Sequence, residues 1–402
     1  MMNDAQTLPQ LAPHDLCTGC AACANGCPKR AIHMLPDREG FLYPTVTDAC
    51  VACGHCTHIC PVLKRREPRS DPAVFAAWNL QDEVRRLSTS GGVFTMLAEG
   101  VLESGGVVCA AAMDKKLHLR HVAVERKEDL AALRGTKYVQ SEIGDLYCRI
   151  QLYLSENRQV LFCGTPCQVD GLYHFLGEHP EGLLTCDVLC GGVPSPGVWE
   201  SIVRSITYIK QKKPVSVNFC DKKYGCKDPH FTVIFADGTS FSAPLSKSEY
   251  GRGLTRSLFL RPACHQCAYA TTDRPGDLSL GAFMGLPKTF YPEEQTKGIS
   301  LLLINTEKGA HAFDLLAVKR EHRTLAEALL NPALRAPVVR PPERPDFFQT
   351  YAQQPFETVR NRFLVPQNLS YQMSRQMRSS GKSAKEPRLS LKKLFQWKKE
   401  KR

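Results

Sequence analysis

Eighteen of the 402 residues are cysteines, and eight of these lie in two runs near the start of the chain. Each run has the pattern C-x2-C-x2-C-x3-C-P, over residues 17–28 and 50–61. Three cysteines in a tight loop present their thiolates to one face of an iron–sulfur cubane, and the proline then turns the chain away. The pattern therefore predicts two 4Fe-4S clusters.

The same pattern predicts how the ligands divide, because in two-cluster bacterial ferredoxins the fourth cysteine of each run binds the other cluster. The first cluster is assigned Cys17, Cys20, Cys23 and Cys60. The second is assigned Cys50, Cys53, Cys56 and Cys27. Zinc and disulfides are the alternatives. Zinc modules rarely carry two such runs with proline after each, and disulfide frameworks belong to secreted chains.

Two more cysteines follow predicted buried strands. Residues 160–162 lead to Cys163-Gly164-Thr165-Pro166-Cys167, and residues 183–189 lead to Cys190-Gly191-Gly192. Open α/β sheets bind ligands beyond the carboxyl ends of their strands, so the thiols of Cys167 and Cys190 are candidate site elements. Further along, Cys264 and Cys267 form a C-x2-C pair.

The elements that must position these residues alternate between strand and helix from about residue 73 to residue 210. This alternation predicts an α/β domain with a largely parallel or mixed sheet. Ser90-Gly91-Gly92 precedes a predicted helix over 93–102, and free N–H groups at a helix start can bind the pyrophosphate of a cofactor. A simple helix cap is the alternative.

Six stretches together resemble the beta subunits of coenzyme F420-reducing hydrogenases and dehydrogenases and their bacterial relatives. They are residues 88–106, 133–143, 162–172, 187–196, 219–225 and 261–285. The resemblance implies an FAD-containing α/β domain that passes electrons between iron–sulfur clusters and a small acceptor. It also implies a third 4Fe-4S cluster, for which the matching cysteines are Cys167, Cys190, Cys264 and Cys267. Zinc is the alternative occupant of four thiolates.

The resemblance also implies flavin contacts at Ser90, Gly91, Gly92, Lys137, Tyr138, Gly164 and Thr165. For Lys137 the alternative is an ordinary solvated lysine. Cys220, Cys226 and Gly191 stand where many bacterial relatives have arginine, tryptophan and histidine. None of the twelve histidines is singled out as a catalytic acid.

We therefore expect an overall α+β chain in three regions. Residues 1–68 form a two-cluster ferredoxin-like module, residues 69–335 an α/β flavin-binding catalytic domain with a mixed sheet, and residues 336–402 a Pro/Arg-rich and basic, partly disordered extension. The expected function is an iron–sulfur flavoprotein oxidoreductase with a donor such as ferredoxin and a small-molecule acceptor. The alternative is an electron-transfer subunit of a larger complex, linked to extracellular polysaccharide biosynthesis and pyruvyl transfer.

Charge argues against nucleic acid as a partner. The net charge is +12, but residues 371–402 carry eleven Lys or Arg against two Glu, so that segment supplies +9 and leaves only +3 for the rest. A nucleic-acid-binding factor with structural metal clusters is the alternative from another class, and it lacks a recognisable reading module.

The absence of an export signal and the many cysteines predict a reducing cytoplasm. Residues 389–399 place Leu391, Leu394 and Phe395 on one helical face among lysines. That pattern predicts either contact with the inner face of a membrane or a solubilising tail.

Overall fold

The computed structural model describes residues 8–223, 225–226 and 228–366. The N-terminal region is built from two short helices, α1 (Ala22–Asn25) and α2 (His55–His58), and an antiparallel hairpin. The hairpin strands are β1 (Ile32–Pro36) and β2 (Leu42–Val46), and the Asp37 carboxylate accepts two backbone N–H groups at their turn. Each helix contains one cysteine of a run and is followed by another. The region therefore consists of two similar halves, with the hairpin between them in sequence.

A mixed sheet of eight strands follows, in the order β13-β3-β12-β11-β7-β6-β4-β5. The pairings make β3, β11, β7, β6 and β4 run in one direction and β12, β13 and β5 in the other. The strands are β3 (Ala73–Asn79), β4 (Val107–Met113), β5 (Leu119–Val124), β6 (Val160–Gly164), β7 (Leu183–Val188), β11 (Leu278–Ala282), β12 (Ser300–Ile304) and β13 (Val318–Arg323). The predicted mixed sheet is therefore present.

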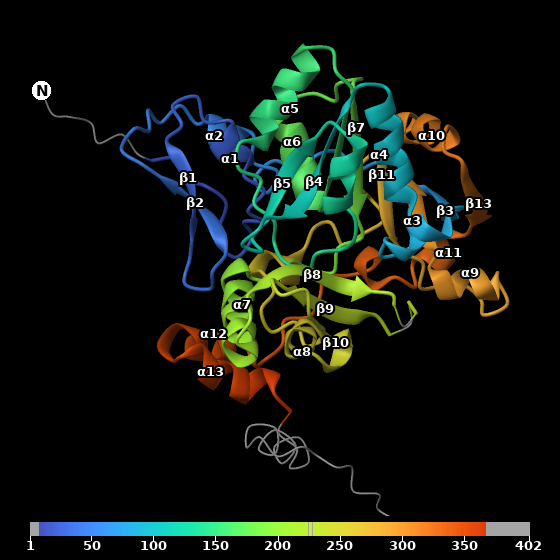
Figure 1. Cartoon of the computed structure of the whole chain (residues 1–402). Coiled ribbons are helices and arrows are strands. Elements are labelled where there is room, and N and C mark those ends of the chain that lie inside the picture. The colour runs from blue at the N-terminus through green and yellow to red at the C-terminus, as the bar shows by residue number, and fades with distance from the viewer. Residues whose placement is uncertain (1–7, 224, 227, 367–402) are drawn as a thin grey trace, which may run out of the picture.

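Helices cover both faces of this sheet (Figure 1). On one face α4 (Val93–Glu103) and α10 (Glu307–Asp314) bury side chains such as Leu97 and Phe313. On the other, α5 (Leu146–Ser155) and α6 (Pro166–Leu176) bury Ile150 and Leu172. Apolar runs such as Val160–Phe162 are typical of strands that are buried on both faces.

Shorter helices complete the layers. They are α3 (Asp82–Arg86), α9 (Pro292–Lys297), α11 (Leu325–Ala328) and the 3-10 helices Lys127–Ala132, Leu245–Lys247, Pro262–Gln266 and Pro332–Leu334.

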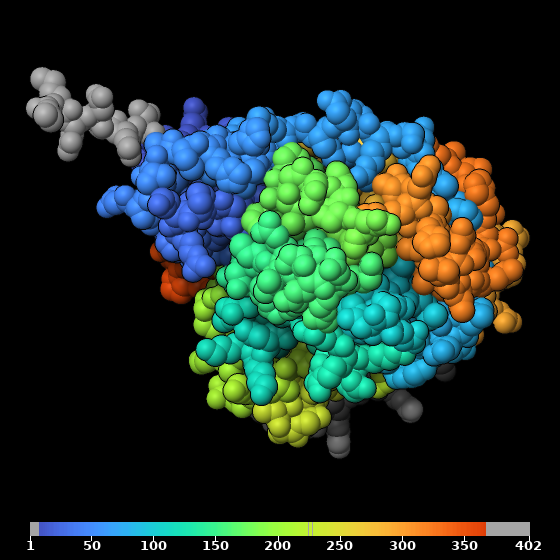
Figure 2. Space-filling model, turned by 90° about the horizontal axis from the view of Figure 1, so that it is seen from above, coloured from blue at the N-terminus to red at the C-terminus, as the bar shows by residue number. Residues whose placement is uncertain are grey.

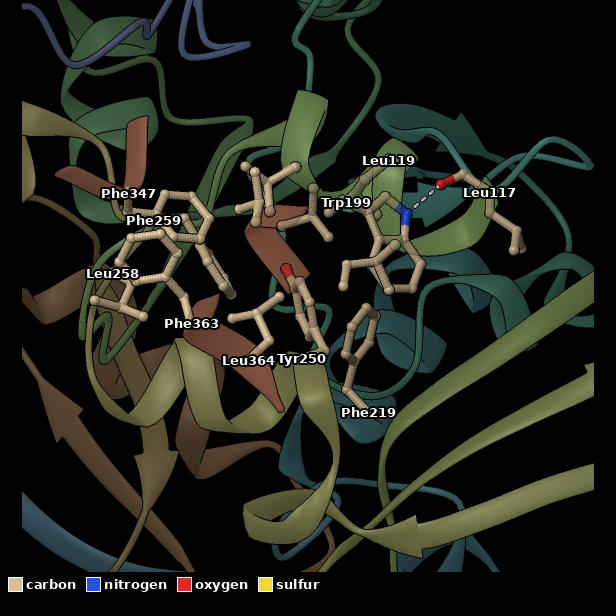
Figure 3. Packing of buried hydrophobic residues seen from close by; sticks show 14 of the residues in the cluster. Leu117, Leu119, Trp199, Phe219, Tyr250, Leu258, Phe259, Phe347, Phe363 and Leu364 are labelled. Carbon is tan, nitrogen blue, oxygen red and sulfur yellow. Dashed lines mark hydrogen bonds between the residues drawn. The ribbon is translucent and has the colours of Figure 1, made fainter. Parts of the chain in front are cut away.

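A second, three-stranded antiparallel sheet lies below the large one in Figure 1, in the order β10-β9-β8. Its strands are β8 (Pro214–Asp221), β9 (His230–Phe235) and β10 (Ser240–Pro244), and α7 (Pro196–Lys210) and α8 (Glu249–Thr255) pack beside it. Figure 3 shows Trp199 of α7 between Phe219 and Leu119, with its ring N–H donating to the Leu117 carbonyl at 2.8 Å. This core ties the small sheet to the end of the β4–β5 hairpin.

Residues beyond 335, predicted as an extension, contribute to that same core. They form α12 (Arg344–Gln353), α13 (Phe356–Val359) and a π-helical turn (Arg360–Leu364). Phe347, Phe363 and Leu364 are buried against Phe259 and Tyr250 (Figure 3). Packed structure therefore continues to the last described residues, and residue 335 does not end it.

The N-terminal region also shares its core with the rest of the chain. Phe41 and Tyr43 belong to the cluster around Trp199, whereas Cys20 and Ala22 belong to the cluster under α5 and α6. In Figure 2 the blue N-terminal residues lie directly against the green surface of α5 and α6. Residue 68 thus separates two sequence patterns but not two hydrophobic cores.

Across the part of the chain that the structure describes, no helix is long and apolar enough to cross a membrane. The amphipathic stretch 389–399 lies outside the described residues.

Candidate iron–sulfur and flavin site

The two cysteine runs form loops with the same backbone geometry. In each loop the residues on both sides of the middle cysteine have positive φ: Gly19 and Ala21 around Cys20 (69° and 63°), and Ala52 and Gly54 around Cys53 (52° and 73°). In the first loop glycine precedes the cysteine and alanine follows it, and in the second loop the order is reversed. Each loop therefore contains one alanine in the left-handed backbone conformation, which glycine adopts more readily. Such turns bring thiols and backbone N–H groups to the same side. Ala31 and Ala52 accordingly donate to the Cys27 and Cys50 sulfurs at 3.3 and 3.4 Å.

The eight cysteines of these runs fall into two spatial groups. Cys17 and Cys60 both lie close enough to Cys20 and Cys23 to raise their thiol pKa values, after burial, which is the larger cause. The other four line one small cavity at the surface and consist of Cys27, Cys50, Cys53 and Cys56. Cys60 has thus joined the first run and Cys27 the second, which is the crossed grouping that the spacing predicts.

A third group of four thiols forms at the carboxyl ends of the sheet strands. Cys167 is the second residue of α6, Cys190 follows β7, Cys264 lies in the 3-10 helix Pro262–Gln266, and Cys267 comes directly after that helix. Burial first, and then the neighbouring thiols, raise the pKa of Cys190 to about 11 and that of Cys264 to about 12. The Gly192 and Val193 N–H groups donate to these two sulfurs, both at 3.4 Å.

This third group needs positive charge, because four buried thiolates repel one another and have lost their hydration. Among the described residues, no group of three or more His, Cys, Asp or Glu is placed to hold a metal ion. A 4Fe-4S cluster is larger than an ion, and each of its four thiolates binds a separate iron atom. The donor set of four thiols with N–H···S contacts fits such a cluster.

The first and third groups lie next to each other across α6. Cys20 and Cys167 are close enough for their thiolates to repel, which contributes to the raised pKa of Cys20. Gly171, one turn along α6 from Cys167, permits this approach, because a Cβ there would stand 2.9 Å from the Cys20 Cβ and 3.0 Å from its sulfur. The Tyr147 hydroxyl holds the same turn by donating to the Gln168 carbonyl at 2.7 Å.

Arg261 is a fully buried cation between these two groups. Its guanidinium donates to the Cys17 carbonyl at 2.7 Å and to the Cys17 sulfur at 3.8 Å, and it lies over the Tyr43 ring. Its charge also favours the Cys264 thiolate. A Cβ on Gly19 would be 2.8 Å from Arg261 Nη1, so the loop leaves room for the arginine. No carboxylate among the described residues forms an ion pair with Arg261.

A buried ion pair fixes the backbone of the third group. Arg274 and Asp187 are 1% and 0% exposed, and Arg274 Nε lies 3.0 Å from the Asp187 carboxylate. Arg274 also donates to the carbonyls of Tyr269 and Val188, which flank Cys267 and Cys190. The loop after β7 and the segment after Cys267 are therefore held by one guanidinium.

The predicted flavin contacts lie along the same carboxyl edge of the sheet. Gly92, with φ of 82°, is the N-cap of α4, and the Ser90 hydroxyl and the Gly91 N–H hydrogen-bond to Ile299 and Ser300 at the start of β12. The Thr136 N–H donates to Thr89 Oγ1 at 2.6 Å, which joins this segment to the stretch containing Lys137 and Tyr138.

Gly164 and Thr165 lie at the end of β6, where Thr165 caps α6 and contacts the Cys167 sulfur at 3.1 Å. The sequence Thr165-Pro166-Cys167-Gln168 has the form of a capping box, a signal from which the start of α6 could have been predicted. The Tyr138 side chain turns instead towards the small sheet, where it contacts Phe219 and accepts from the Cys220 thiol at 3.4 Å.

Lys137 is not a solvated lysine. Its ammonium donates to the Leu133 and Arg134 carbonyls at 2.8 and 2.9 Å, and burial lowers its pKa to about 8. Lys222, on the far side of Ser90, donates to the Ser90 carbonyl at 2.9 Å, and burial lowers its pKa to about 8 as well. The Lys222 ammonium thus lies beside the start of α4, and Lys137 follows Thr136, whose N–H is bonded to Thr89 of the same segment. Positive charge at a helix start suits an anionic group such as a flavin phosphate.

Asn79 is a residue that sequence reasoning missed. It ends β3, is 1% exposed, and lies beneath Gly91 and Gly92, while its amide nitrogen has no hydrogen-bond partner among the described residues. A buried donor without a partner at the start of α4 fits a bound polar group there. Its position at the carboxyl end of an apolar strand was the only available signal.

Comparison with known proteins agrees with this geometry. Residues 74–146 match the N-terminal part, and residues 157–327 the C-terminal part, of the family described as "Coenzyme F420 hydrogenase/dehydrogenase, beta subunit". Residues 16–64 match a 4Fe-4S dicluster domain. The chain belongs to the family of coenzyme F420 hydrogenase/dehydrogenase beta subunits, with an N-terminal 4Fe-4S dicluster domain.

Among individual relatives, the F subunit of the F(420)H(2) dehydrogenase of Methanosarcina mazei is 22% identical over 326 residues, which are 78% of this chain and 86% of that protein. An uncharacterized polyferredoxin-like protein of Methanocaldococcus jannaschii is 34% identical over 68 residues, 14% of this chain and 39% of that protein. In the structure of the F420-reducing NiFe hydrogenase complex from Methanosarcina barkeri, one chain aligns over 73% of this chain and 92% of its own length, at 19% identity and a TM-score of 0.44.

The family predicted from the sequence is therefore confirmed. Its members are iron–sulfur, FAD-binding oxidoreductase components, and the predicted class of electron-transferring iron–sulfur flavoprotein is confirmed with it.

Proposed function

We propose that this chain passes electrons between three 4Fe-4S clusters and FAD to reduce or oxidise a small organic acceptor. The clusters are held by the three cysteine groups described above. Clusters carry one electron at a time, whereas FAD collects the two that an organic acceptor requires. The single observation that supports this proposal best is the continuity of the site, since the first and third cysteine groups meet at Cys20 and Cys167.

The three cysteine groups differ in their exposure to solvent, and this difference gives the proposed electron route a direction. Cys53, in the group formed by Cys27, Cys50, Cys53 and Cys56, is exposed, whereas Cys20 is 8% exposed and Cys167 is only partly exposed. An external donor such as ferredoxin would therefore exchange electrons at the Cys53 end. Arg261 and Arg274 would hold the cluster ligands in position. Lys137, Lys222 and Asn79 would face the flavin.

The FAD site that we propose lies at the start of α4. Ser90, Gly91 and Gly92 would present backbone N–H groups, Lys137 a positive charge, and Gly164 and Thr165 the adjoining backbone at the end of β6. The small sheet lies next to this edge through Tyr138 and Phe219, so it would exclude water from one side of the site.

A second candidate function is an electron-transfer subunit of a larger complex without its own acceptor site. The Methanosarcina mazei relative supports it, because that protein is named as one subunit of a dehydrogenase. Anaerobic turnover of the reduced protein alone with a panel of acceptors, F420 and unsaturated sugars included, separates the two functions. Oxidation of the flavin by one member of the panel supports the first, and oxidation by none supports the second.

The order of the sites is tested with a Cys264→Ala, Cys267→Ala double variant. We expect it to lose about a third of the iron and to stop flavin reduction, while the two N-terminal clusters remain reducible by dithionite. Flavin reduction at the wild-type rate in this variant would show that electrons reach the flavin without the third group.

A further inference from the structure

Six of the eighteen cysteines belong to none of the three groups, and two of these six face each other. Cys163 of β6 and Cys186 of β7 are direct partners in the parallel register of the large sheet. Both side chains point to the face that α4 covers, where Cys186 is fully buried and Cys163 partly buried. The Cys163 thiol is within hydrogen-bonding reach of the Cys186 thiol, which is the largest cause of the raised pKa of Cys186.

The backbone spacing at this pair suits a covalent bond. Adjacent strands lie about 4.7–4.9 Å apart, and disulfides join residues whose Cα atoms are about 4.4–6.8 Å apart. Because the two residues are paired in register, their Cβ atoms leave the sheet on the same side. Closing the bond therefore needs rotation of side chains and no shift of the strands.

The surroundings of the pair connect it to the redox site. Cys163 and Cys186 each precede a ligand of the third group by four residues, Cys167 and Cys190 respectively. The Lys137 ammonium lies close enough to Cys163 for the two charges to interact, and Lys137 is one of the proposed flavin contacts. His121 Nε2 is hydrogen-bonded to the Cys163 carbonyl at 3.1 Å and helps to fix the end of β6, while its ring stacks on Phe162 of the opposite face.

We propose that Cys163 and Cys186 are a redox-active dithiol that closes to a disulfide at the flavin side of the third cysteine group. The pair stores two electrons in protein side chains, next to a site at which single electrons become pairs. Two S–H bonds break and one S–S bond forms, and the two electrons and two protons pass to a two-electron acceptor. The FAD of the proposed function is one such acceptor, and a soluble disulfide is another. Only the choice of FAD as partner rests on the proposed function.

The dithiol is tested in the anaerobic holoenzyme, equilibrated with mixtures of reduced and oxidised dithiothreitol and then alkylated and digested. We expect the peptides of Cys163 and Cys186 to lose alkylation together as the mixture becomes more oxidising. A linked pair of peptides, two hydrogen masses lighter than their sum, should appear at the same time. Alkylation of both cysteines in every mixture, or a link from either one to Cys167 or Cys190, would overturn the proposal.

Electron counting gives a second measurement that does not depend on the flavin contacts. Reductive titration of the oxidised wild type should consume about two more electron equivalents than that of Cys163→Ser or Cys186→Ala, with iron and FAD content unchanged. The control is Cys109→Ala, which removes an equally buried thiol of β4 that faces the opposite side of the sheet. Equal electron counts for all four proteins would overturn the dithiol, whereas missing FAD or iron in the wild type would count against the proposed function.

Discussion

The cysteines of residues 17–60 are brought together by their own loops, whereas Cys167, Cys190, Cys264 and Cys267 are brought together by the large sheet. In the first region the ligand spacing is short and the backbone adopts positive φ beside each middle cysteine. In the second, nearly a hundred residues separate Cys167 from Cys264, and the ligands come from the ends of β6 and β7 and from a 3-10 helix. Local geometry builds one kind of site and tertiary structure the other.

This difference has a consequence for stability. The N-terminal region has little regular structure beyond one hairpin and two single-turn helices, so bound clusters would supply part of its folding energy. The third group lies on a sheet with its own buried faces. We therefore expect loss of a ligand to unfold the first region and to leave the second folded.

The largest effect is expected for Cys20→Ser. Cys20 is buried between α1 and α6, and its loss should remove one cluster, about four irons, and loosen the neighbouring cluster. Iron analysis and proteolysis of residues 8–66 measure both effects. Cys148→Ser, at an exposed cysteine outside all three groups, is the control and should leave the iron content unchanged. Full iron content in Cys20→Ser would contradict the ligand assignment.

The second-largest effect, on the free energy of unfolding, is expected for Arg274→Ala in the sheet region. It leaves the Asp187 carboxylate buried without a partner, which should lower the free energy of unfolding by about 3–5 kcal/mol. Anaerobic denaturant unfolding measures this loss. The control is Arg86→Ala, which breaks an exposed pair with Glu83 and should leave the free energy of unfolding nearly unchanged, because exposed ion pairs contribute little. Equal losses for the two variants would refute the positioning role of Arg274.

The same contrast decides how much the sequence could predict. The spacing of Cys17 to Cys60 predicts its own grouping, because three ligands of each cluster lie in one short run and the paired-run pattern itself assigns the fourth to the other run. The pair Arg274 and Asp187 could not be predicted, since 87 residues separate them and only the pairing of β7 with β11 brings them together. The strands β3 to β7 could be predicted from their apolar runs. The position of β12, antiparallel between β3 and β11, could not, because it depends on pairing between strands that are distant in the sequence.

Arg261 connects the two regions, and its replacement should shift a potential rather than stability alone. A buried cation beside Cys17 stabilises the reduced, more negative cluster, so Arg261→Met should lower the midpoint potential of that cluster. We expect a shift of the order of a tenfold change in the reduction constant, about 59 mV for one electron. Arg261→Lys keeps the charge and should shift less. Potentiometric titration with electron paramagnetic resonance measures both, and an unchanged potential in Arg261→Met contradicts the role.

The smallest effect is expected from the titration of Lys137. Burial lowers its pKa from 10.5 to about 8, so without flavin the folded chain binds fewer protons than the unfolded chain between these values, and stability rises with pH across that window. An anionic flavin group instead favours the charged lysine, so FAD affinity should fall as the pH rises through about 8. Released flavin fluorescence on either side of that pH measures the change. Lys137→Met should weaken this pH dependence and leave the part that Lys222, with a similar pKa, supplies. An unaltered dependence would remove Lys137 from the flavin site.

The central claim is that local loops and the large sheet hold three clusters in one row beside a flavin. It is tested most directly by measuring iron, zinc and FAD in wild-type protein prepared without oxygen. We expect about twelve irons, one FAD and no zinc per chain. Eight irons with one zinc would contradict it, since the four thiols on the sheet would then hold a metal that carries no electrons.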